Sequence, residues 1–306
     1  MKLLKTLRLT LVLLISFLPL SFVHSADPTP NTEVHSKEDS IVRILAIGNS
    51  FSEDAMEHFL FGLAKADGKK VIIGVLFIGA SDLDLHWKNA SNELNKYNYR
   101  KISPDGEKVK TPGVSISTAL ADEKWDYISF QQVSTKSGLY DTYVSPLTNL
   151  LAYVKSKSDP ETKFILHQTW AYRKSSPEKR FENYGGSQEG MYQAIVETTR
   201  RIKKDFDFDL LVPSGTAIQN ARTSFIGDNL NRDDLHLTLY LGRYIASCAW
   251  YETIFNTKVI GNKFLPENIT AHQAEMAQHA AHYARKKPFR VTELKKFKTQ
   301  KHQPVD

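Results

Sequence analysis

Residues 41–52 read IVRILAIGNSFS: seven largely β-branched and apolar residues, followed by a glycine and a polar turn. The apolar run predicts a buried β-strand over residues 41–47. Residues 53–66 then carry apolar side chains at helical spacing, and Asp67-Gly68 closes the stripe, so a helix is expected there. Gly48-Asn49-Ser50 therefore lies in the turn between the first strand and the first helix.

The same alternation continues along the chain. Further strands are expected over 71–78, 126–131, 163–169 and 208–212, and helices over 114–124, 146–157, 187–206, 238–255 and 271–287. Near-continuous apolar strands separated by helices are typical of a parallel sheet with helices on both faces. We therefore predict an α/β protein with a five-stranded parallel sheet. Residues 88–112 are polar and contain two turns with Pro and Gly, so they are interpreted as an insertion between the second and third strands.

The composition is that of a globular protein. The 306 residues are 41% hydrophobic and 24% charged, fractions that exclude disordered, collagen-like and coiled-coil chains. A single cysteine, Cys248, excludes an intrachain disulfide and a zinc site built from several cysteines. The net charge is +6, but residues 1–25 contribute +3 and residues 285–306 contribute +6, which leaves −3 on the body. No nucleic acid partner is predicted for such a body.

The N-terminus has the three-part layout of a secretory signal peptide. Basic residues precede an apolar run of about 15 residues, and small residues lie before Ala26. The run is shorter than the roughly 20 residues that a membrane-spanning helix needs, which disfavours an uncleaved anchor. The mature chain is expected to be exported, periplasmic or secreted, without stable membrane insertion. The predicted parts are a signal peptide over 1–25, a flexible lead-in over 26–40, a main domain over 41–287 and a basic tail over 288–306.

Polar and small residues follow the predicted strands at their carboxyl ends, where ligands bind in open α/β sheets. Gly79 follows the second strand, and Asp233-Asp234-Leu235-His236 precedes a late helix. Three further segments follow the third, fourth and fifth strands: 131–134 (QQVS), 168–172 (QTWAY) and 213–216 (PSGT). We expect these segments to lie near Ser50, at one edge of the sheet.

Ser50 is the candidate nucleophile at this edge. A serine hydroxyl needs a base to take its proton, and His236 is a suitable base because histidine titrates near neutral pH. Asp233, three residues earlier, can hold the ring in one tautomer; Asp234 and Asp228 are the alternative acids. The N–H groups of Ser50 and Gly79 can stabilise an oxyanion. The plainer interpretation is that the serine and the aspartate only cap a helix and a turn.

The order of these residues resembles the SGNH, or GDSL-like, hydrolases. More narrowly, the chain looks like an exported bacterial branch of that superfamily, on the basis of residues 48–52, 131–134, 213–222 and 234–237. The resemblance spans about residues 41–260. It implies a three-layer α/β/α sandwich with a flavodoxin-like sheet, and ester hydrolysis without a metal or organic cofactor. Carried onto matching positions, it implies a nucleophile, a backbone donor, an acid and a base at Ser50, Gly79, Asp233 and His236.

Two positions depart from the superfamily's pattern. Asn49 stands where the first block usually has Asp, and we expect little effect from this change. The third block usually reads Gly-x-Asn-Asp and supplies an oxyanion donor through the Asn side chain, but this chain has no such motif. Gln131, Gln132 or Ser134 lies where that Asn would be. Gln132 is assigned as the third donor, because its amide can donate as an Asn amide does.

Two further groups of side chains allow more than one interpretation. Aromatic residues that follow strand ends can stack on a sugar ring or belong to ordinary packing: Trp87, Trp170 and Tyr172. A stripe at helical spacing has the ligand types of a zinc site, but it lies away from the expected edge: His272, Glu275, His279 and His282. The aromatic residues are assigned to substrate binding, and no metal site is assigned.

The sequence thus predicts a serine esterase that releases a small acyl group, with acetate favoured, from a small-molecule or polysaccharide ester. Carbohydrate is the favoured alcohol, because export, the resemblance and the nearby aromatic residues agree with it. One alternative is a lipid-directed esterase or thioesterase, which needs an apolar acyl channel. Another is a non-catalytic glycan-binding module on a hydrolase fold, which the missing Gly-x-Asn-Asp motif would allow.

Overall fold

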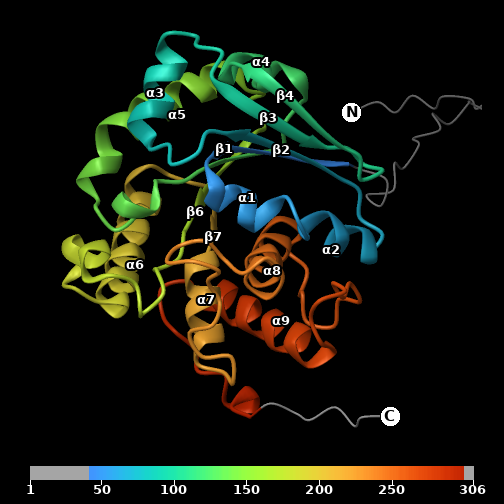
Figure 1. Ribbon diagram of the computed structural model, residues 1–306. Helices are drawn as coiled ribbons and strands as arrows, with labels where there is room; N and C mark the ends of the chain where they lie inside the picture. Colours follow the sequence, from blue (N-terminus) through green and yellow to red (C-terminus); the bar gives the residue numbers. More distant parts are fainter. Residues whose placement is uncertain (1–40, 300–306) are drawn as a thin grey trace, which may run out of the picture. The chain divides into compact units, whose positions relative to one another are not determined.

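The computed structural model describes residues 41–299 (Figure 1). The predicted signal peptide, the lead-in and the end of the tail, residues 300–306, lie outside the described residues. Within them a seven-stranded sheet has the order β4-β3-β2-β1-β5-β6-β7. Its strands are β1 (Val42–Gly48), β2 (Val71–Phe77), β3 (Tyr97–Ile102), β4 (Lys108–Val114), β5 (Tyr127–Phe130), β6 (Lys163–His167) and β7 (Leu210–Val212).

The predicted parallel core is present. Strands β2, β1, β5, β6 and β7 are parallel neighbours in the order 2-1-3-4-5 of a flavodoxin-like sheet, counted by the five expected strands. Strand β1 is buried on both faces: Ile44 and Ala46 belong to one hydrophobic cluster, and Leu45 and Ile47 belong to the other. Because side chains alternate along a strand, this pattern requires helices on both sides.

The expected strand number of five is wrong, because β3 and β4 add an antiparallel hairpin to β2. Residues 88–112 are therefore not a simple polar insertion. In β3, Tyr97 and Tyr99 are buried in the cluster on one face of the sheet and Ile102 in the cluster on the other, while β4 is exposed up to Val114. Polar residues separate the buried ones in β3 and make up most of β4, so neither strand shows the continuous apolar run that indicates a buried strand.

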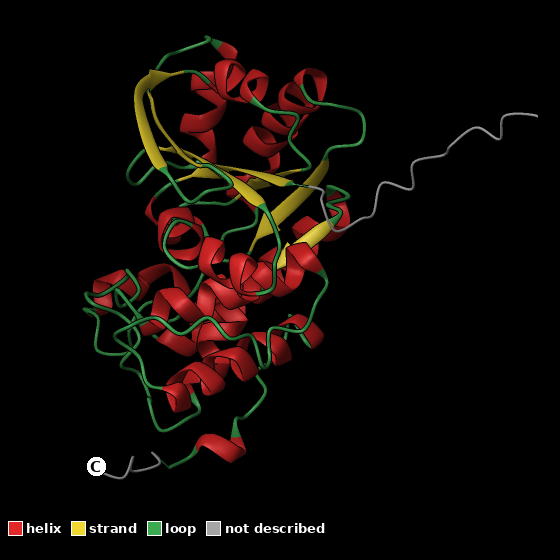
Figure 2. Ribbon diagram, turned by 90° about the vertical axis from the view of Figure 1, so that its right-hand side faces the viewer, coloured by secondary structure: helices red, strands yellow, loops and turns green. Residues whose placement is uncertain are grey.

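Helices cover both faces of the sheet (Figures 1 and 2). On one side lie α3 (Leu83–Ser91), α4 (Ile116–Asp122) and α5 (Asp141–Lys157). On the other lie α1 (Ser50–Met56), α2 (Leu60–Ala66), α7 (Ser214–Arg222), α8 (Leu241–Phe255) and α9 (Ala271–Lys286), with α6 (Gln188–Asp205) packed against them. Within residues 41–299 the 3₁₀ helices are Ser134–Lys136, Glu178–Tyr184 and Lys295–Phe297. This is the predicted three-layer α/β/α sandwich.

Several element boundaries differ from the prediction. The helix expected over 53–66 is two helices, α1 and α2, with a break at residues 57–59 where the Lys108 ammonium donates to the carbonyl of Glu57. Helices α3 and α7 were not predicted. Residues after α9, assigned to the basic tail, include Leu294 and Phe297, which are buried against the core. Among residues 41–299, no helix combines the length and the apolar character that crossing a bilayer requires.

Candidate active site

Ser50 is the first residue of α1, directly after β1. The side chain of Asn49 fixes this turn, because its Oδ1 accepts a hydrogen bond from the N–H of Phe51 (3.0 Å) and its Nδ2 donates to the carbonyl of Ser81 (2.9 Å). A carboxylate at this position would lack the second bond, since it has no hydrogen to donate. The amide at residue 49 therefore joins the ends of β1 and β2.

The Ser50 hydroxyl contacts the ring of His236. The distance from Ser50 Oγ to His236 Nε2 is 2.9 Å, and His236 Nδ1 lies 2.8 Å from Asp233 Oδ2. The other oxygen of Asp233 accepts hydrogen bonds from the N–H groups of Leu235 (2.8 Å) and His236 (2.6 Å). The loop thus holds the carboxylate and the ring in a fixed relation, and the ring reaches the hydroxyl with its remaining nitrogen.

Partial burial opposes ionisation of Asp233, but the hydrogen bonds from His236 and Leu235 outweigh it, and the pKa of this carboxyl lies below its ordinary value. The carboxylate is therefore charged at neutral pH. A charged acceptor at Nδ1 favours the tautomer with the proton on that nitrogen, which leaves Nε2 as the acceptor that faces Ser50.

The alternative acids are used elsewhere. Asp228 accepts a hydrogen bond from the N–H of Lys174 (2.6 Å) and forms an ion pair with Arg222 (2.8 Å). Asp234 lies within 3.7 Å of Arg173 and 3.5 Å of Arg180. Of the three acids on this loop, Asp233 is the one in contact with the His236 ring.

A buried carboxylate, Asp54, connects helix α1 to the loop that carries His236. It is fully buried and accepts hydrogen bonds from Arg232 Nη1 (3.1 Å), from Arg243 Nε (2.7 Å) and from the N–H of Leu237 (2.9 Å). Asp54 lies one helical turn after Ser50, and Leu237 directly follows His236. These contacts therefore set the separation of the hydroxyl and the ring.

Trp170 supports the same arrangement from below. Its ring stacks on Phe51 with centroids 4.3 Å apart, and its Nε1 donates to the carbonyl of Leu235 (2.8 Å). It is fully buried, so it is a core residue under α1 and not a surface for a sugar. Trp87 packs partly buried against the hydrophobic cluster on the other face of the sheet. The structure therefore brings neither tryptophan to the cavity described next.

A cavity of about 580 Å³ lies over Ser50, and its wall includes His236, Gly79, Ala80 and Tyr172. The N–H groups of Ser50 and Gly79 have no acceptor among residues 41–299. Ala80 has a φ of 54°, a left-handed conformation that residues other than glycine rarely adopt. Backbone strain of this kind is usually kept where a site needs a particular backbone direction. Tyr172 is the one predicted aromatic residue that the structure brings to the cavity.

The structure does not bring Gln132 to this cavity. Its Nε2 donates to the carbonyl (3.0 Å) and the hydroxyl (3.3 Å) of Thr142, and its Oε1 accepts from the N–H of Leu83 (3.1 Å). The amide is fully buried and joins α3 to α5, so its donors are already occupied. The assignment of Gln132 as an oxyanion donor rested on residue type, which does not reveal the direction of the side chain.

Gln131 belongs to a buried network beneath Ser50. Its Nε2 donates to Asn49 Oδ1 (2.7 Å), and its Oε1 accepts from Ser52 Oγ (2.6 Å) and contacts His167 Nδ1 (3.2 Å). His167 Nε2 in turn lies 3.0 Å from Ser214 Oγ. Burial lowers the pKa of His167 to about 3, so the ring is neutral.

The histidine stripe of α9 does not gather around one point. His282 pairs with Glu252 (2.7 Å), His272 stacks on Phe225, and Glu275 lies 2.5 Å from Lys296. No group of three potential metal ligands is found in the described part of the chain.

Comparisons with known proteins agree with this fold. A family model described as a domain of unknown function, DUF4886, matches residues 43–284. The crystal structure of a DUF4886 family protein from Bacteroides uniformis is 46% identical with a TM-score of 0.83, over 85% of this chain and 100% of that one. No curated protein matches the chain.

Two more distant structures also match. An acetylxylan esterase from Geobacillus stearothermophilus is 14% identical with a TM-score of 0.45, over 74% of this chain and 97% of that one. A member of the lipolytic G-D-S-L family from Veillonella parvula is 12% identical with a TM-score of 0.44, over 71% and 100%. The predicted three-layer α/β/α arrangement is confirmed by the structure.

Asp54→Asn tests the connection between α1 and the His236 loop. Removing one partner of a buried ion pair leaves the other charge uncompensated, so we expect a loss of about 3–5 kcal/mol in the free energy of unfolding, measured by urea denaturation. Asp159→Asn, which removes a partner of the exposed Lys124 at 3.0 Å, is the control and should change stability far less. Equal effects of the two variants would contradict the role given to Asp54; Arg232→Met provides a second variant.

His167→Gln tests the buried neutral ring. The pKa of His167 falls from 6.5 to about 3 on folding. As the pH falls from 6.5 toward 3, the imidazole is therefore protonated in the unfolded chain but not in the folded one, and the free energy of unfolding decreases. Between pH 7 and 4.5 the free energy of unfolding should decrease in both proteins, and the decrease should be roughly 2–3 kcal/mol smaller in the variant than in the parent. Urea denaturation at several pH values measures this difference, and parallel pH profiles would contradict it.

Proposed function

The chain belongs to the DUF4886 family, and we propose that it is a serine esterase of the SGNH type. The observation that carries the proposal is the continuous row of hydrogen bonds from Ser50 through His236 to Asp233, with distances of 2.9 and 2.8 Å. A serine hydroxyl that only caps a helix has no need of an imidazole whose other nitrogen contacts a carboxylate.

In the proposed reaction Ser50 Oγ attacks the carbonyl carbon of an ester while His236 Nε2 takes the hydroxyl proton. The negative charge on the carbonyl oxygen accepts hydrogen bonds from the free N–H groups of Ser50 and Gly79. The intermediate collapses, the bond to the alcohol breaks, and His236 returns the proton to the leaving oxygen. Water, with His236 again as base, then hydrolyses the acyl group from Ser50.

The charged Asp233 has two tasks in this scheme. It keeps the proton on Nδ1, so Nε2 is free to accept, and it stabilises the imidazolium that forms when Nε2 is protonated. The hydrogen bonds from the loop backbone keep the carboxylate in place during both steps. Gln132 has no part in the scheme, so the oxyanion is held by two backbone donors.

We propose a small acyl group, with acetate favoured, and a carbohydrate alcohol as the substrate. Polar side chains stand around the outer part of the cavity, and Tyr172 lies in its wall but is fully buried and offers no open face to a sugar ring. Export of the chain, which rests on the predicted signal peptide, would give it access to extracellular glycans. A lipid-directed esterase or thioesterase would differ in its preference for long acyl chains.

A fluorophosphonate probe tests the nucleophile. The purified protein should be labelled at Ser50, located by mass spectrometry of peptides, because the hydroxyl is activated by His236. Labelling should vanish in Ser50→Ala and fall by about 10³-fold or more in His236→Ala and Asp233→Asn. Ser156→Ala, at an exposed serine on α5 away from the cavity, is the control and should keep the label. A folded parent that resists the probe would remove the case for a serine esterase and favour a glycan-binding module.

The preferred length of the acyl chain distinguishes an esterase for small acyl groups from a lipid-directed esterase. We expect kcat/KM to be highest for 4-nitrophenyl acetate and to fall by tenfold or more for the octanoate, because the proposed acyl site takes a small group. A rise in kcat/KM with chain length would favour the lipid-directed alternative instead.

A further inference from the structure

A second cavity adjoins the one over Ser50. It has a volume of about 390 Å³ and shares Thr135, Tyr172 and Arg180 with the first cavity. A third hollow of about 560 Å³ continues outward and shares Lys179 and Glu182 with the second. Because each hollow has wall residues in common with the next, the three form a row that leads away from Ser50 along the segment after Tyr172.

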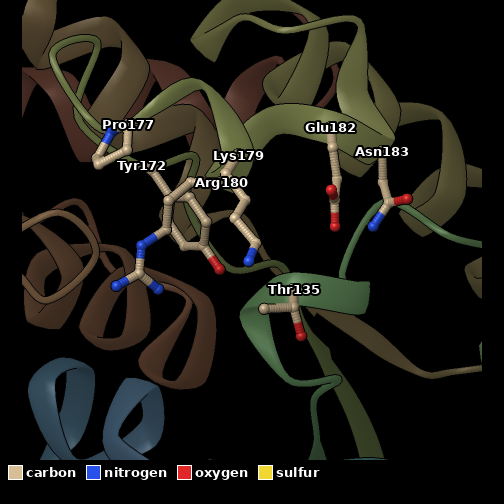
Figure 3. A pocket seen from close by; sticks show the side chains of 7 residues that line it. All are labelled: Thr135, Tyr172, Pro177, Lys179, Arg180, Glu182 and Asn183. Atoms are coloured by element: carbon tan, nitrogen blue, oxygen red, sulfur yellow. The ribbon is translucent and has the colours of Figure 1, made fainter.

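Three side chains of the second cavity are free to bind a ligand. Lys179, Glu182 and Asn183 descend from the 3₁₀ helix Glu178–Tyr184 toward Thr135 on the facing wall (Figure 3). None of the three forms a hydrogen bond or ion pair with another residue in the range 41–299. An ammonium, a carboxylate and an amide together offer donors and acceptors, which is what a molecule with many hydroxyl groups requires.

The helix that carries these side chains is firmly attached to the body. Phe181 and Tyr184, three residues apart, are both buried, as the period of a 3₁₀ helix allows. The hydroxyl of Tyr184 donates to the carbonyl of Thr135 (2.8 Å) and accepts from the N–H of Gly138 (3.3 Å). Because Phe181 and Tyr184 fix one face in the core, the backbone that carries the exposed Glu182 and Asn183 is held beside the cavity before any ligand arrives.

The cavity over Ser50 has apolar side chains in its wall beside polar ones such as Asp82 and Lys136, and the second cavity has fewer apolar ones. Near Ser50 the wall includes the apolar side chains of Phe51, Val133 and Leu235. Farther out, the side chains that line the second cavity are mostly polar. An ester that places a small acyl group at Ser50 would therefore extend its alcohol portion into the polar hollows.

On the basis of the proposed esterase function, we propose that the second and third hollows form a leaving-group groove that binds an oligosaccharide. The sugar unit that carries the ester would lie beside Ser50, and further units would lie along residues 179–186. Lys179, Glu182 and Asn183 are then specificity-determining residues that contact the sugar hydroxyls beyond the ester. A single acetylated sugar would leave the outer groove empty.

The test measures kcat and KM separately for acetylated mono-, di- and tetrasaccharides of the gluco and xylo series, with acetate release as the signal. In the full chain KM should fall at least tenfold from the mono- to the tetrasaccharide in one series, while kcat stays within about threefold. Glu182→Ala and Asn183→Ala should flatten this dependence on length. Glu267→Ala, at an exposed glutamate outside the groove, is the matched control and should keep it.

The outcomes separate this inference from the proposed function. Suppose that the protein hydrolyses 4-nitrophenyl acetate. If its KM for acetylated sugars does not depend on their length, or if that dependence persists in both groove variants, the proposed groove is wrong and the proposed esterase function stands. If no ester is hydrolysed, the esterase proposal fails. Calorimetry then measures binding of the unacetylated tetrasaccharide to the Ser50→Ala variant. Binding that weakens when Glu182→Ala is added to this variant supports the proposed groove, and the absence of binding contradicts it.

Discussion

The hydrogen bonds of Asp54 determine the geometry of the site more than any other contact does. This carboxylate lies in the interior between two guanidinium groups, those of Arg232 and Arg243. Charges removed from water are tolerated only when paired and hydrogen-bonded, so the three groups must stay together for the chain to fold. Since Asp54 is on the helix that begins with Ser50, and the N–H of Leu237 joins the same carboxylate, folding itself brings the hydroxyl and the imidazole together.

Support from beneath makes the arrangement stiff. Trp170 fills the space under α1 and also binds the carbonyl of Leu235, so one indole contacts both sides of the site. The network of Asn49, Gln131 and His167 joins the ends of β1, β5 and β6. Catalytic groups need positions accurate to a fraction of an ångström, and buried, hydrogen-bonded supports of this kind provide them.

The parallel core, Ser50, Gly79 and the His236 loop could be recognised from the sequence because each depends on local patterns: apolar runs, strand-end turns and a three-residue spacing. Asp54 could not, since its partners lie about 180 residues away and no local pattern links them. Gln132 failed for a related reason: residue type fixes what an amide can do but not where it points. The β3–β4 hairpin was missed because polar residues separate the buried ones in β3 and make up most of β4.

The same hairpin has a consequence for how the protein behaves at high concentration. Strand β4 is the outer strand on its side of the sheet, and it carries Lys108, Lys110 and Pro112. Lysines resist the approach of a second strand through their charge, and proline removes a donor that such a strand would need. At the opposite edge β7 has three residues. Both borders of the sheet are thus poor templates for strand addition, which protects the folded chain from edge-to-edge aggregation.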